Sequence, residues 1–187
     1  MTGNAAPARK LPLRLLPFML LPQLVWAAID GAYVFGRLTG HRYAKMLGLR
    51  QAAERALRRG QLERTQRLAQ ELLDLAPQFR RDWNYGNAVH HGHRLLGEVA
   101  LQRGDIGRAR EELLAAGRTP GSPQLNSFGP NMSLAKRLLE RGERDVVLEY
   151  FALCAAFWKS DIQGSLPAWT AAVREGRMPE FRRNLIY

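Results

Sequence analysis

The stretch VHHGHRLLGEVALQRGDIGRAREELLAAG, residues 89–117, predicts two helices joined by a tight turn at Gly104. Apolar side chains recur on both sides of this turn at the spacing that places them on one stripe of a helix. Glycine adopts the left-handed conformation that ends a helix at little cost, so the chain can reverse direction within a few residues. We therefore expect a helical hairpin here.

The same pattern occurs three times along the chain, each time around an Arg-Gly dipeptide. A leucine stands three residues before each glycine. A small residue stands seven before it, where a neighbouring helix could approach closely. Neither helix of such a hairpin can bury its apolar stripe alone, so the hairpins are expected to stack on one another. The aligned positions are Gly60, Gly104 and Gly142, then Leu57, Leu101 and Leu139, then Ala53, Gly97 and Ala135.

The turn glycines, the small residues before them and Pro77, which closes the first copy, resemble the tetratricopeptide (TPR) repeat family. A fourth, degenerate copy is expected at Gly176, which lies 34 residues beyond Gly142, the spacing typical of TPRs. The resemblance implies an all-α, TPR-like solenoid of three hairpins plus a C-terminal capping hairpin, preceded by a hydrophobic N-terminal helix, as in bacterial-type TPR-like proteins. The alternative is an irregular helical bundle whose hairpins share a common turn.

The hairpins are expected at residues 43–75, 87–116 and 132–158, with two short capping helices in residues 161–187. In the linker after the first hairpin, Trp83 and Tyr85 are expected to cover the seam to the next one. Residues 117–131, GRTPGSPQLNSFGPN, lack helical periodicity and are expected to form an ordered loop, tied down by Leu125 and Phe128.

The length of 187 residues suits one helical repeat domain, residues 37–187, after an N-terminal extension, residues 1–36. A net charge of +11 favours anionic partners: lipid headgroups, nucleic acid or acidic proteins. The basic residues are nevertheless spread over all the predicted helices, as on an ordinary solvated surface. A single cysteine, Cys154, excludes an internal disulfide framework and is expected to be buried.

The extension combines a polar start, expected to be disordered, with an apolar segment, LPLRLLPFMLLPQLVWAAIDGAYVF, residues 11–35. Three interpretations compete: a retained membrane segment, a cleaved secretory signal and a helix packed on the repeats. Pro17, Pro22 and Asp30 argue against a regular spanning helix and favour a segment lying in the membrane interface. We expect membrane association, on a side that the flanking basic residues do not determine.

Catalytic and cofactor motifs are absent from the sequence, which holds no GxSxG, P-loop or Rossmann glycine pattern. His90 and His93 could share a helix face, but a metal site needs further ligands, and neither HExxH nor a cysteine pair is present. We therefore expect no enzyme, no cofactor and no metal.

The resemblance implies a partner-binding groove on the concave face made by the first helix of each hairpin. Some TPR proteins clamp a C-terminal carboxylate there with lysine, arginine and asparagine, but glutamates at 54 and 98 and a methionine at 132 break that pattern. A mixed polar groove remains, beside the loop of residues 117–131. The expected partner-binding residues are His90, His91, Arg94, Glu98, Asn126, Ser127, Asn131 and Lys136.

Together these features predict a non-catalytic, membrane-associated protein–protein interaction scaffold or adaptor that binds a peptide or helix on its concave face. One alternative is a soluble or exported TPR adaptor. Another is a basic helical repeat protein that binds nucleic acid, which is the weaker expectation. A small-molecule substrate is not expected.

Overall fold

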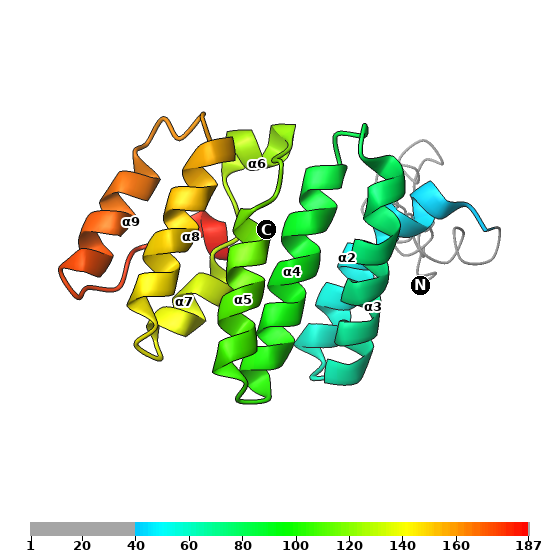
Figure 1. Cartoon of the computed structure of the whole chain (residues 1–187), viewed down its shortest axis with the longest axis horizontal. Coiled ribbons are helices and arrows are strands. Elements are labelled where there is room, and N and C mark those ends of the chain that lie inside the picture. Colours follow the sequence, from blue (N-terminus) through cyan, green and yellow to red (C-terminus); the bar gives the residue numbers. More distant parts are fainter. Residues whose placement is uncertain (1–39, 187) are drawn as a thin grey trace, which may run out of the picture.

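The computed structural model describes residues 40–186, and this part of the chain is all α-helical, without a β-strand (Figure 1). The all-α prediction is therefore confirmed. The hydrophobic segment of residues 11–35 lies outside the described residues. The helices are α2 (Arg42–Arg58), α3 (Leu62–Leu75), α4 (Tyr85–Gln102), α5 (Ile106–Gly117), α6 (Pro123–Phe128), α7 (Ser133–Leu139), α8 (Arg144–Phe157) and α9 (Ser165–Arg174), with 3₁₀ turns η2 (Ala76–Phe79) and η3 (Arg182–Leu185).

The long helices lie side by side in chain order, from α2 and α3 at one end to α9 at the other (Figure 1). α2 packs on α3, α3 on α4, α4 on α5, α5 on α8, and α8 on α9. α2 also contacts α4, so these two first helices of successive hairpins are neighbours. The core follows this order: one apolar cluster joins α2, α3 and the start of α4, and a second runs from the end of α4 to Phe181.

All four predicted turn glycines have the left-handed backbone, with φ of +68° at Gly60, +82° at Gly104, +84° at Gly142 and +76° at Gly176. At each one the glycine N–H donates to the carbonyl three residues back. The next N–H donates to the carbonyl five residues back, as from Asp105 to Ala100 over 2.9 Å. This pair of bonds is the Schellman motif, which satisfies the last carbonyls of a helix. The three Arg-Gly glycines and Gly176, which follows a glutamate, therefore mark four helix ends of one geometry.

The small residue seven before each glycine lies at a tight helix contact. Ala53 and Ala135 are fully buried. A Cβ placed on Gly97 would lie 2.3 Å from Cδ2 of Leu134 and 3.2 Å from Cβ of Glu112. A larger residue at these positions would push the neighbouring helix away, because a well-packed interior has no spare volume.

The structure departs from the expected elements in three places. Within the segment of residues 117–131, α6 forms where only an ordered loop was expected. After Gly176 no second capping α-helix follows, and η3 is the only helical turn there. Trp83 does not cover the seam between hairpins, since 53% of its surface is exposed, whereas Tyr85 packs against the first apolar cluster.

Replacing Gly104 with valine should lower the free energy of unfolding by about 2 kcal/mol, because a β-branched residue resists a positive φ. No atom lies within 4 Å of the position that a Cβ would take, so the effect is one of backbone strain alone. Chemical denaturation of the purified protein measures it. Gly104→Asn is the control and should cost less than half as much, because asparagine tolerates the left-handed region. Equal losses for the two variants would contradict this explanation.

Candidate binding groove

The eight residues expected to bind a partner lie in different environments. His90, His91, Arg94, Glu98 and Asn131 are buried, with between 0% and 6% of their surface exposed. Asn126 and Lys136 are partly exposed, and Ser127 is exposed.

Arg94 joins three helices. Its Nη2 lies 2.9 Å from Oε1 of Glu54 on α2, and its Nη1 donates to the hydroxyl of Ser133 on α7 over 3.2 Å. Burial lowers the pKa of the guanidinium, and the nearby carboxylates of Glu54 and Glu98 oppose that shift. The guanidinium is buried while Glu54 is partly exposed, and removing either partner would leave Arg94 without its ion pair, so Arg94 acts as a structural cross-link between hairpins.

Glu98 makes a second cross-link of the same kind, an ion pair with Arg137 on α7. The two cross-links use repeated positions: Glu54 and Glu98 both lie six residues before a turn glycine. Each of these two glutamates therefore pairs with an arginine of the next hairpin, Glu54 with Arg94 and Glu98 with Arg137.

His90 is fully buried and has both ring nitrogens occupied. Its Nε2 accepts a hydrogen bond from the backbone N–H of Asn131 at 3.3 Å, so its Nδ1 carries the proton and donates to the carbonyl of Ala116, also at 3.3 Å. Burial, and then the charge of Arg94, lower the pKa of His90 to about 3. His90 is therefore a neutral side chain that ties α4 to the loop before α7.

His93 bonds to a carboxylate on the neighbouring helix α5. Its Nδ1 lies 2.7 Å from Oε2 of the buried Glu112, which also pairs with Arg108. Among residues 40–186, no group of three or more His, Cys, Asp or Glu side chains is placed to hold a metal ion.

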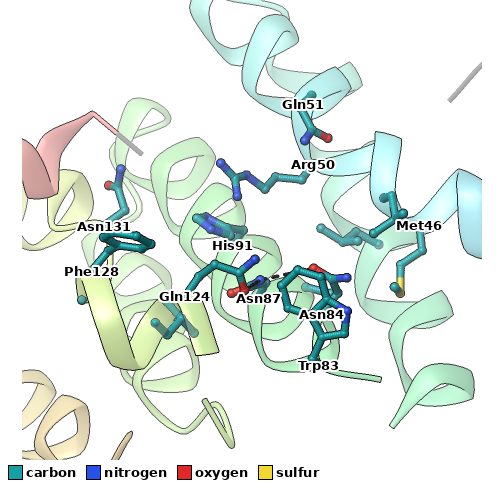
Figure 2. Close-up of a pocket in the computed structure, with 15 residues that line it drawn as sticks. Met46, Arg50, Gln51, Trp83, Asn84, Asn87, His91, Gln124, Phe128 and Asn131 are labelled. Atoms are coloured by element: carbon teal, nitrogen blue, oxygen red, sulfur yellow. Dashed lines mark hydrogen bonds between the residues drawn. The ribbon is translucent and has the colours of Figure 1, made fainter. Parts of the chain in front are cut away.

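A groove of about 690 Å³ opens between α2, α4 and α6 (Figure 2). α4 supplies its floor through Asn87, Ala88 and His91. Only His91 and Asn131 of the eight expected residues line it. The remaining lining comes from α2, from α3 and the loop after it, and from α6 and the glycine that ends it: Met46, Leu47, Arg50, Gln51, Leu72, Trp83, Asn84, Gln124, Leu125, Phe128 and Gly129.

Large apolar side chains are exposed at the groove. Trp83 and Phe128 each expose 53% of their surface, and Leu47 exposes 37%. They are three of the seven large apolar residues that are exposed among residues 40–186. Such a concentration beside a concave surface is typical of a binding site, because an isolated monomer gains nothing from it.

Two buried polar atoms that belong to groove residues have no hydrogen-bond partner, Oε1 of Gln51 and Nδ1 of His91. Burial and the charge of Arg50 hold the pKa of His91 well below its usual range, so its ring is neutral at physiological pH. Both atoms are inaccessible to solvent, so they lie beneath the groove surface, and each costs about 1–3 kcal/mol for want of a partner among the described residues.

The position of α6 is fixed by backbone contacts at its start. Gly86 and Gly121 touch so closely that a Cβ on Gly86 would lie 1.7 Å from the carbonyl oxygen of Gly121. The hydroxyl of Thr119 donates to the carbonyl of Gly86 over 2.7 Å. Ser122 then caps α6 by accepting the N–H of Leu125 at 3.0 Å.

Residues 181–184, near the C-terminus, hold the other end of α6 and the loop that follows it. The side-chain amide of Asn184 donates to the carbonyls of Phe128 and Pro130 over 3.0 and 3.1 Å. The backbone carbonyl of Asn184 accepts from the N–H of Met132 at 2.7 Å. Phe181 anchors this segment, since its ring lies 5.0 Å from that of Trp169. Residues more than 50 positions apart therefore build one side of the groove together.

No family of proteins, no characterised protein and no solved structure was found to match this chain. Between residues 40 and 186 no helix combines the length and the apolar character needed to cross a membrane. The groove presents apolar surface, amide groups, one neutral histidine and one arginine. Cys154 lies buried elsewhere, and burial raises the pKa of its thiol far above the usual range.

Proposed function

We propose that this protein is a non-catalytic interaction scaffold that binds a segment of a partner protein in the groove between α2, α4 and α6. The exposure of Leu47, Trp83 and Phe128 around this groove carries the proposal. Aromatic and large aliphatic side chains at a concave surface are the usual centres of protein–protein binding energy.

The proposed architecture is a TPR-like solenoid. Two observations support it: the same Schellman turn recurs at four glycines, and each long helix packs chiefly on its neighbours in chain order. Stacked hairpins of this kind present the first helix of each hairpin on one face, and α2 and α4, which carry much of the groove, are two such helices.

The partner is tested by photo-crosslinking from within the groove. A protein carrying p-benzoylphenylalanine in place of Phe128 should crosslink, in cells, to a discrete protein that mass spectrometry identifies. The same photoreactive residue in place of Ile162 is the matched control, because Ile162 is 95% exposed but does not line the groove. A second substitution, Leu47→Asp, should abolish the crosslink from position 128. Equal crosslinking from both positions would contradict a partner site in the groove.

We also propose that residues 11–35 attach the scaffold to a membrane. The support is their uncharged run from residue 15 to residue 29. Deleting residues 1–35 should move the protein from the membrane pellet to the supernatant when cells are fractionated. The full chain with Leu47→Asp is the control and should remain in the pellet. If the truncated protein still sediments with membranes, its Arg-rich helices must make the contact.

A further inference from the structure

We propose that the groove recognises an internal segment of its partner, by one bulky apolar side chain with an acidic residue close to it, and that it needs no free chain end. This inference rests on the proposed function and specifies its partner. It follows from the shape of the groove, from its amide groups and from its charge.

The apolar part of the groove suits a single large side chain. The groove as a whole has a volume of about 690 Å³, so one large anchor side chain would fill a part of it and leave the rest to the adjoining main chain. Trp83 comes from the loop after α3 and Phe128 from α6, so neither belongs to a repeated hairpin. Both rings line the same groove, Phe128 on the side of α6 and Trp83 on the side of the loop after α3 (Figure 2). The partner is therefore expected to insert one anchor.

The polar part suits the main chain on either side of that anchor. Five amide side chains line the groove: Gln51, Asn84, Asn87, Gln124 and Asn131. An amide both donates and accepts, so it matches the N–H and C=O groups that every extended segment carries. Asn87 donates to Oε1 of Gln124 over 2.8 Å, and the amide nitrogen of Gln124, which takes no part in that bond, can donate to a carbonyl of the partner.

The charge of the lining favours an acidic neighbour for the anchor. Among residues 40–186, Arg50 is the only lining residue that carries a charge at neutral pH, since no aspartate or glutamate of this part lines the groove and His91 is neutral. Arg50 bonds to Glu54 through Nε, at 3.2 Å. The two other nitrogens of its guanidinium leave further donors for a carboxylate of the partner.

A clamp for a terminal carboxylate would need several cations on successive helices. Arg94, at the position on α4 that corresponds to Arg50, is buried and committed to Glu54 and Ser133. The corresponding residue before α7 is Met132, which is fully buried. Of these three corresponding positions, only that of Arg50 presents an accessible cation. A single cation suits one side-chain carboxylate within a continuous segment.

The test uses the full-length chain in lipid nanodiscs and a library of random 12-residue segments displayed within a loop of a carrier protein, so that no segment has a free end. Selected segments should share one Trp, Phe, Leu or Met with Asp or Glu within a few positions. Replacing either residue with alanine should weaken binding about tenfold or more. Phe128→Ala and Arg50→Gln should each weaken the binding of the selected segments, whereas Ile162→Ala, outside the groove, should not.

The outcomes separate the two proposals. Segments that bind in the groove, as judged by loss with Phe128→Ala, but share no apolar anchor or acidic residue would overturn this inference and leave the proposed function standing. Binding by free C-terminal peptides but not by loop-displayed segments would overturn it in the same way. If no segment, free or displayed, loses affinity with Phe128→Ala, both proposals fail.

Discussion

Replacing Gly86 with alanine should lower the free energy of unfolding by about 3 kcal/mol, although the change adds a single methyl group. That methyl carbon would lie 1.7 Å from the carbonyl oxygen of Gly121, well inside contact distance. The obstacle is backbone, so no side-chain rotation can relieve it. The segment that begins α6 must move instead, and the hydrogen bond from Thr119 to the carbonyl of Gly86 would be lost with it. Urea denaturation of the full chain measures the loss.

Gly107→Ala provides the matched control, because Gly107 is also a helical glycine. A Cβ there would meet only a carboxylate oxygen of Asp105, at 3.7 Å. Alanine favours the helix over glycine, so this variant should gain up to about 0.5 kcal/mol. The same pair of variants also tests the groove: Gly86→Ala should weaken partner binding by displacing α6, and Gly107→Ala should not. Equal stability of the two variants would show that Gly86 and Gly121 do not touch in solution.

The helices of the hairpins could be predicted from the sequence because their ends are encoded locally. A turn glycine, a leucine three residues before it and a small residue seven before it define each hairpin, and these signals depend only on neighbouring residues. The six-residue helix α6 gives too little length for an apolar period to appear. The sequence nevertheless marks the start of α6, because Ser122 followed by Pro123 is a typical N-cap and first helical residue.

The groove was harder to predict because it depends on contacts between distant parts of the chain. Arg94 and Glu98 look like surface residues in the sequence, yet both are buried as partners of residues about 40 positions away. The recurrence of glutamate six residues before two turn glycines was a usable sign of such pairing. The exposure of Trp83 and Phe128 had no sign in the sequence, since each lies in a segment whose path is set by tertiary contacts.

Acidification should destabilise the folded protein between pH 6.5 and about 3, chiefly through His90, whose pKa falls from 6.5 to about 3 on folding. The unfolded chain binds a proton in this range and the folded chain does not, so stability is complete above pH 6.5 and decreases as the pH falls. One such histidine removes about 1.4 kcal/mol per pH unit, or about 3 kcal/mol by pH 4.5. His91, whose pKa is also lowered by burial, adds to the loss in the same direction.

The decisive measurement is the slope of unfolding free energy against pH in the wild type and in His90→Gln. Glutamine does not titrate, so between pH 6 and 4 the slope of the variant should be smaller by about 1.4 kcal/mol per pH unit, which corresponds to one proton. This difference does not depend on the absolute stability of the variant. Arg50, Arg94 and His93 surround this pair of histidines and disfavour their protonated forms. Arg50→Gln should therefore make the slope shallower at the lower end of the range, because it removes one of these charges. Identical slopes in the wild type and in His90→Gln would mean that His90 protonates as easily in the folded chain as in the unfolded one. A protonated ring cannot accept the N–H of Asn131, so the two hydrogen bonds of His90 would then not form as described.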